Sequence, residues 1–190
     1  LHAMIEHTGR IGGNLVAVIL GCNDRFYFVR TGEAIDEPGL ARILSPIFMN
    51  HDITLISHDV KSLYTWILSY GLELECSLFD LMIAEYLLDS LADSYSIDSL
   101  SARHLGRSPN LPEAFRGTGR QRYSELSHDE LVCAAGKAVS LFRPIYRIQN
   151  QKLDENNMHF LYNDVELPLA MVLGSMEYYG FKVDRDALEE

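Results

Sequence analysis

The sequence offers few side chains whose type and spacing indicate metal binding or nucleophilic chemistry. Its seven histidines form no HxH or HxxxH pair and its three cysteines form no CxxC pair, so no transition-metal site is expected. Asp59 directly precedes an apolar helical pattern, where capping of the helix is a more common role than metal ligation. Cys133 falls in a helical pattern and is interpreted as a small buried side chain rather than a nucleophile.

The basic residues gather in one part of an otherwise acidic chain. Residues 101–150 carry eight bases and four acids, whereas residues 1–100 and 151–190 sum to −9 and −6. Because phosphates attract positive charge, any contact with DNA is expected in this basic stretch. The candidate DNA-contacting residues are Arg103, Arg107, Arg116, Arg120 and Arg122. The alternative is a loop whose arginines are solvated or ion-paired with acidic side chains.

Composition excludes several classes of protein. With 190 residues, 47% of them apolar, the chain can bury the core of one compact domain. An odd number of widely spaced cysteines predicts a reducing, cytoplasmic setting rather than a disulfide framework. The longest apolar run, residues 15–20, is too short to span a bilayer, and charged residues interrupt the apolar start, so neither a membrane partner nor a signal peptide is expected. The net charge of −11 by itself disfavours nucleic acid as a partner.

Strands dominate the first third of the predicted structure. Residues 14–20 are almost uniformly apolar and β-branched, which is typical of a strand covered on both faces. Further strands are expected at 1–5, 25–30 and 53–56, with a short helix at 39–49.

Helical patterns follow. An apolar stripe predicts a helix from Val60 to about Leu68, with Asp59 as its N-cap and Gly71 as its stop. Largely buried helical residues are expected at 79–88.

The remaining helices follow in the order 96–105, 129–150 and 166–179, with a loop rich in Pro and Gly at 106–123. Pro144 is expected to kink or interrupt the second of these helices. The last helix carries an apolar stripe formed by Leu169, Val172, Leu173 and Met176. Strands followed by helices predict an α/β domain with a central sheet and helical cover.

Several motifs occur in a fixed order along the chain: YGLEL at 70–74, FD at 79–80, AEYLL at 84–88, IDSLSARHL at 97–105, RGTGR at 116–120, ELPLA at 166–170 and EYYGFKVD at 177–184. Together they resemble the proofreading-exonuclease region of bacterial family A DNA polymerases, the DNA polymerase I group. The resemblance implies a ribonuclease-H-like fold, with a mixed central β-sheet flanked by helices, over residues 1–160. Residues 161–190 would then begin the polymerase domain or form its connecting helix.

The same resemblance implies partners and cofactors. The C-terminal polymerase domain would be a partner in cis, DNA would be bound through the parent polymerase, and the whole would be a cytoplasmic monomer. Magnesium is expected for the polymerase domain, and no cofactor for residues 1–160. Asp80 and Asp98 resemble family positions that lie outside the metal cluster. Helix capping or hydrogen bonding is therefore expected for both side chains.

Active members of the family hydrolyse phosphodiester bonds with two divalent ions, which require a cluster of carboxylates. The resemblance assigns those ligands to an Asp-x-Glu on the first strand, an Asp in a helix and a final Asp four residues after a Tyr. In this sequence the corresponding positions are His2, Met4, Leu63, Lys137 and, for the Tyr, Cys133. The sequence therefore predicts no catalytic residues and no metal site.

Two alternatives remain open at this point. A nuclease with relocated ligands would use Glu6, Asp59 or Asp80. A stand-alone nucleic-acid-binding module of the same fold is disfavoured by residues 180–184, which resemble a chain entering a polymerase domain.

Overall fold

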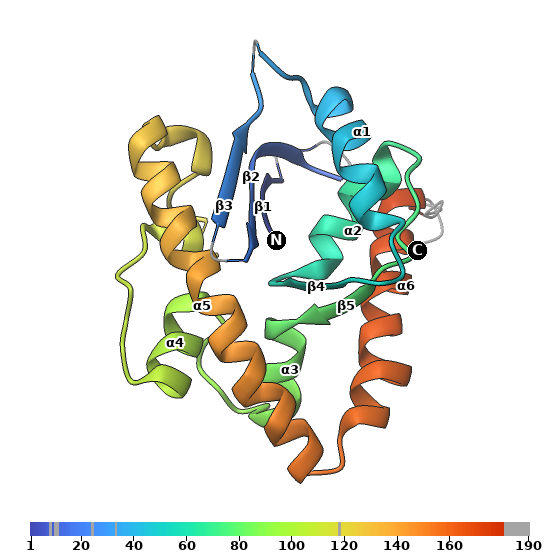
Figure 1. Ribbon diagram of the computed structural model, residues 1–190, viewed down its shortest axis with the longest axis vertical. Coiled ribbons are helices and arrows are strands. Elements are labelled where there is room, and N and C mark those ends of the chain that lie inside the picture. The colour runs from blue at the N-terminus through green and yellow to red at the C-terminus, as the bar shows by residue number, and fades with distance from the viewer. Residues whose placement is uncertain (8, 10–11, 24, 33, 118, 181–190) are drawn as a thin grey trace, which may run out of the picture.

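Among the residues that the structure describes, five strands and six α-helices form an α/β domain, shown as a computed structural model in Figure 1. The structure describes residues 1–7, 9, 12–23, 25–32, 34–117 and 119–180. Residues 181–184 of the motif that resembles a polymerase entry therefore lie outside the described part of the chain.

The strands form an antiparallel and a parallel group. Strands β1 (His2–Glu6), β2 (Asn14–Cys22) and β3 (Arg25–Arg30) pair antiparallel in the order β1-β2-β3. Strands β4 (Thr54–Ser57) and β5 (Ser77–Asp80) pair in parallel. The two groups meet where the amino group of Leu1 donates a 2.7 Å hydrogen bond to the carbonyl oxygen of Ile56. The predicted mixed sheet is thus present as two sheets joined at their edges.

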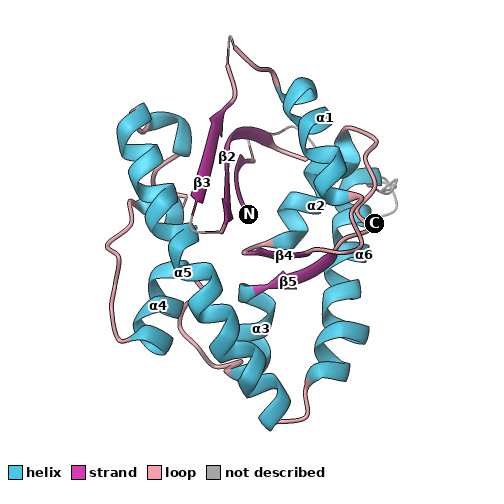
Figure 2. Ribbon diagram, in the orientation of Figure 1, coloured by secondary structure: helices cyan, strands magenta, loops and turns pink. Residues whose placement is uncertain are grey.

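The helices cover the strands from both sides (Figure 2). Their bounds are α1 Glu37–Phe48, α2 Val60–Ser69, α3 Leu81–Leu88, α4 Ile97–Leu105, α5 His128–Glu155 and α6 Leu167–Tyr179. Short 3-10 turns occur at Glu113–Arg116 and Tyr123–Glu125, and a π-helical turn, Leu161–Glu166, leads into α6. None of the described helices is long and apolar enough to cross a membrane.

Strand β2 lies between two hydrophobic clusters, as its continuous apolar run predicts. Ala17 and Ile19 belong to a cluster with residues of α3, α4 and α5. Leu15 and Val18 belong to a second cluster with residues of α1 and α2. Side chains of this one strand therefore contribute to both helical layers.

Three sequence-based expectations were wrong. Residues 79–80 are not helical, because they end the short strand β5, which the sequence analysis missed. Of the kink or interruption predicted at Pro144, the interruption does not occur, because the hydrophobic contacts of the buried neighbours Leu141, Phe142 and Ile145 offset the one backbone hydrogen bond that proline lacks. Helix α5 also extends beyond its predicted end, to Glu155.

The apolar stripe predicted on α6 is present, and its side chains are about half-exposed. Leu169, Val172, Leu173 and Met176 are 43–54% exposed. The helix instead packs on α2 through its small residues. A Cβ atom on Gly174 would lie 3.1 Å from the Oγ1 atom of Thr65, a tight contact, so glycine favours this close approach of the two helices.

Candidate functional site

A cleft of about 690 Å³ opens between β1, the N-terminal ends of α2 and α4, and the turn at Glu113–Arg116. His2 reaches it from β1 and Asp59 from the loop before α2. Arg116 and Arg122 line its other side. The cleft therefore brings together residues that the sequence analysis assigned to two different roles.

His2 is the one member of the predicted degenerate set that lines this cleft. Its ring lies 5.7 Å from the ring centroids of both Phe115 and Phe142, and neither ring nitrogen has a hydrogen-bond partner. Burial, with a smaller contribution from the charge of His58, lowers the pKa of His2 to about 3. The imidazole is therefore neutral at physiological pH and sits in an aromatic environment.

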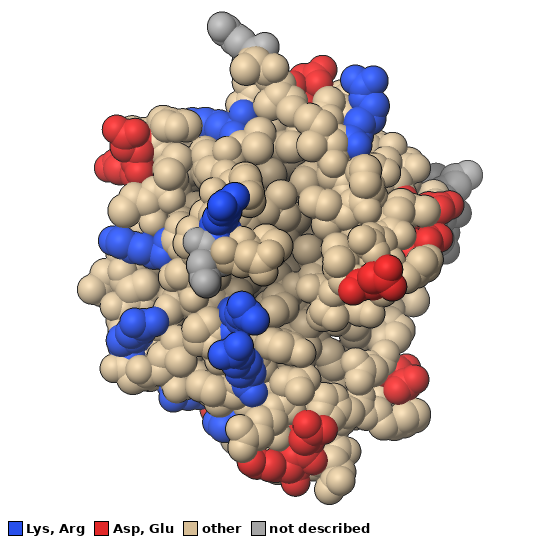
Figure 3. All heavy atoms as spheres, in the orientation of Figure 1, with Lys and Arg blue, Asp and Glu red and all other residues tan. Residues whose placement is uncertain are grey.

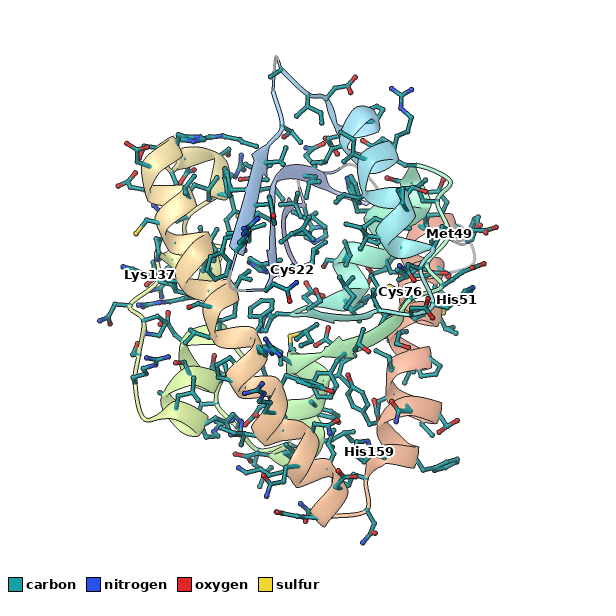
Figure 4. The ribbon with its side chains drawn as sticks, in the orientation of Figure 1. Cys22, Met49, His51, Cys76, Lys137 and His159 are labelled. Carbon is teal, nitrogen blue, oxygen red and sulfur yellow. The ribbon has the colours of Figure 1, made fainter. Side chains whose placement is uncertain are left out.

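The four other positions of that set do not converge on the cleft. Met4 belongs to the hydrophobic cluster beneath α5, and Leu63 belongs to the opposite cluster beneath α1 and α2. Cys133 and Lys137 are one turn apart on the exposed side of α5, and Figure 4 shows Lys137 pointing outward. Cys133 was predicted to be buried, and this was wrong because the buried positions of α5 are its neighbours Ala134 and Ala135.

Two carboxylates at the cleft bind neighbouring donors. Asp59 caps α2, as predicted, accepting hydrogen bonds from the backbone N–H of Ser62 at 3.3 Å and from its hydroxyl at 2.6 Å. Glu6 accepts from the backbone N–H of Ser124 at 2.7 Å and from its hydroxyl at 3.1 Å. Both side chains are therefore engaged in holding loops in place.

Asp80 is a helix cap as well, and it is fully buried. It caps α3 by accepting from the backbone N–H groups of Met82 (2.7 Å) and Ile83 (3.0 Å). It also accepts from the backbone N–H of Val60, the first residue of α2. Burial raises the pKa of Asp80 even though these donors and His58 favour its charged form. One carboxylate thus positions the N-terminal ends of two helices.

These arrangements leave the described residues without a metal centre: no three His, Cys, Asp or Glu side chains among them are grouped so as to hold an ion. In a relocated cluster, the carboxylates of Glu6, Asp59 and Asp80 would have to bind an ion while competing with the backbone and hydroxyl donors described above.

Arg103 and Arg116 form ion pairs, as the alternative interpretation of the basic stretch proposed. Arg103 on α4 pairs with Glu85. Arg116 donates to Asp98 at 3.3 Å and to Glu113 at 2.9 Å, which confirms a hydrogen-bonding role for Asp98.

The other three candidate arginines are exposed. Of these, Arg107 and Arg122 have no ion-pair partner among the residues that the structure describes, and Arg122 lines the cleft. The RGTGR turn containing Arg116 and Arg120 is incompletely described, because residue 118 lies outside the described part.

Comparison with known proteins shows which family this chain belongs to. Residues 7–137 match the model for "DNA polymerase I, ribonuclease H-like domain". The chain belongs to this family. It is 29% identical over 182 residues to DNA polymerase I of Streptococcus pneumoniae, covering 93% of this chain and 19% of that protein. It is 31% identical over 123 residues to DNA polymerase I of Geobacillus stearothermophilus, covering 63% of this chain and 14% of that protein.

A solved structure shares the fold of this chain. It is the POL domain of Pol1 from M. smegmatis in complex with DNA primer-template and dNTP, with a TM-score of 0.70 at 19% identity. The match covers 99% of this chain and 30% of that one. The chain spans less than a fifth of the length of the curated DNA polymerase I relatives described above.

The ribonuclease H-like domain also contains a buried polar network that the sequence analysis missed. Glu85 on α3 is 1% exposed and contacts Arg103, His104 and Gln149. Burial raises the pKa of Glu85, but hydrogen bonds from these three partners outweigh it and hold that pKa at about 2. Glu85 belongs to the AEYLL motif, and its partners Arg103 and His104 belong to the IDSLSARHL motif. The sequence analysis therefore singled out both segments, but their spacing did not show that these side chains are in contact.

Proposed function

We propose that this chain is the catalytically silent 3′–5′ exonuclease-like domain of a bacterial DNA polymerase I, which supports template-directed DNA synthesis by the parent enzyme. The observation that carries the proposal is the set of residues at the positions where the family places its metal ligands. Met4 and Leu63 are apolar and lie in separate hydrophobic clusters, and Lys137 is exposed and cationic.

A two-metal nuclease needs several carboxylates that together hold two divalent ions about 4 Å apart. His2 alone reaches the cleft from the corresponding positions, and its low pKa leaves it as an isolated neutral imidazole. A single imidazole provides no bridging oxygen for hard cations such as Mg²⁺. The proposed loss of catalysis therefore follows from ligand number as well as from ligand type.

The loss of a carboxylate cluster also predicts that this domain folds without metal, because mutually repelling buried carboxylates destabilise an empty site. Apolar side chains at Met4 and Leu63 contribute packing instead. Magnesium is proposed only for the polymerase domain of the parent enzyme.

We further propose that the polymerase domain is a partner in cis and contacts α6. The exposed apolar side chains of that helix, Leu169, Val172, Leu173 and Met176, form a face that no other described element covers. Because this chain covers only 19% of the Streptococcus pneumoniae relative, that relative contains the additional sequence that such a contact requires. A cytoplasmic, monomeric parent that binds DNA through its polymerase domain completes this proposal.

The decisive experiment measures shortening of 5′-labelled single-stranded DNA with Mg²⁺ or Mn²⁺. We expect no shortening and no large metal-induced rise in melting temperature. Metal-dependent shortening that is lost in Asp80→Asn but retained in Lys137→Ala would refute the proposal and favour the relocated nuclease. Asparagine is used because it retains an N-cap for α3. A parent reading frame that ended soon after Glu190 would refute the polymerase assignment and favour a stand-alone module.

A further inference from the structure

A second and larger concavity lies away from the cleft. It measures about 1270 Å³ and runs between the closed end of the β2–β3 hairpin, strand β4 and the middle of α5. No residue that lines it also lines the cleft described above. We call it the hairpin groove.

Three arginines line the hairpin groove. Arg143 and Arg147 are one helical turn apart on α5, so they occupy the same face of that helix, and Arg25 approaches from β3. All three are exposed, and none forms an ion pair or side-chain hydrogen bond with any described residue. Asp52 is the one acidic residue among the described lining residues. The groove is therefore locally cationic.

This local charge is unusual in a chain with 27 acidic and 16 basic residues. Arg103 and Arg116 find acidic partners within the fold, whereas the groove arginines do not. Figure 3 shows Lys and Arg side chains gathered over α5 and the nearby hairpin end, with Asp and Glu mainly toward the periphery of the same face. At about 0.1 M salt, charges beyond roughly 10 Å are screened, so a ligand in the groove responds to its arginines rather than to the net charge.

Aromatic side chains stand beside these arginines. Phe26 and Tyr27, at the end of the hairpin, are 49% and 53% exposed and line the groove. The ring of Phe26 lies over Gly21, where a Cβ atom would come within 3.2 Å of the ring and 2.9 Å of Val139. Gly21 therefore lets the hairpin end lie close to α5, with the Phe26 ring packed beside it.

We propose that the hairpin groove binds a single strand of nucleic acid. Arg25, Arg143 and Arg147 would contact backbone phosphates, and bases would stack on Phe26 or Tyr27, the combination of cationic groove and aromatic platforms that single-strand sites use. The hairpin groove is a different surface from the cleft that contains His2, so this inference stands whether or not that cleft is catalytically silent.

The test measures binding of fluorescein-labelled (dT)20 to the 190-residue chain by fluorescence anisotropy at 50 and 200 mM NaCl. Three phosphate contacts predict a slope of log Kd against log salt of about 2. Arg143→Ala combined with Arg147→Ala should weaken binding at least tenfold at 50 mM NaCl and reduce that slope below 1. Phe26→Ala should weaken binding about fivefold or more through lost stacking.

Lys137→Ala is the matched control, because Lys137 is an exposed cation of the same helix that does not line the groove. It should change Kd less than twofold, and circular dichroism should show every variant folded. The proposal fails if (dT)20 does not bind at 50 mM NaCl, or if Arg107→Ala combined with Arg122→Ala abolishes binding while the groove variants retain it. It also fails if duplex DNA binds as tightly as (dT)20 and Phe26→Ala has no effect.

Discussion

Replacing Glu85 with glutamine would remove the single negative charge at the centre of the buried α3–α4–α5 network. Its carboxylate lies 2.5 Å from both the Nη1 atom of Arg103 and the Nε2 atom of His104, and accepts from Gln149 at 2.7 Å. Glutamine has nearly the same shape but cannot balance the charge of Arg103. The change therefore isolates electrostatics from packing.

The size of the effect follows from the pKa. A carboxyl whose pKa falls from an ordinary 4.5 to about 2 on folding contributes roughly 3 kcal/mol at neutral pH. Because Glu85 is 1% exposed, solvent screens this contribution little. The folded-state pKa is the depressed one, so the contribution is complete above pH 4.5 and is lost as the pH falls toward 2.

Urea unfolding followed by circular dichroism at pH 7 and pH 3 provides the assay. Relative to the unchanged protein, Glu85→Gln should be destabilised by roughly 3 kcal/mol at pH 7 and by less than half of that at pH 3. Glu73→Gln is the control, because Glu73 is exposed, and it should change stability by less than about 0.5 kcal/mol at both pH values. An equal penalty for Glu85→Gln at pH 7 and pH 3 would refute the electrostatic explanation.

Two further predictions concern His2 and α6. His2→Phe should stabilise the domain by about 1 kcal/mol at pH 7, by removing two unpartnered buried nitrogens. In urea titrations at pH 5 this gain should be larger by roughly 2 kcal/mol. The folded-state pKa of His2 is about 3, so the unchanged protein loses stability as the pH falls below 6.5, whereas the variant does not. A variant less stable than the unchanged protein at both pH values would contradict this. Val172→Lys combined with Met176→Lys should alter the stability of the 190-residue chain by less than about 0.5 kcal/mol, since both side chains are half-exposed. The same pair should lower the melting temperature of the parent polymerase by about 2 °C or more, while Leu91→Lys, at 91% exposure, should leave both proteins unchanged.

Local patterns predicted much of the fold. Asp59 caps α2 as expected, because capping depends on a donor only three residues away. The run at 14–20 became β2 because a uniformly apolar strand needs cover on both faces. Strand β5 was missed because its four residues pair in parallel with a strand more than twenty residues earlier, which no local pattern reveals. In addition, a short apolar run is equally consistent with a helix and with a strand.

The candidate site was harder to predict, because its side chains meet across the sequence. Glu85 lies 18 residues from Arg103, so no helical or strand spacing indicates the pair. Cys133 was assigned to the wrong side of α5, since the period of that helix alone does not determine which face meets the sheet. The motif resemblance identified the family correctly, yet it did not show which arginines are already ion-paired.

The net charge of −11 and a nucleic-acid contact are compatible because acidic and basic side chains have different roles in this fold. Asp59 and Asp80 cap helices, and Glu85 is surrounded by donors, so these charges are largely used within the domain. The cations of the hairpin groove, Arg143 and Arg147 among them, have no such partners in the described residues and remain available to a ligand. The surplus of acid in the sequence therefore says little about the potential over α5. If the groove binds a single strand, lower salt should strengthen binding despite the negative charge of the whole chain, since the slope reflects the phosphates contacted rather than the net charge.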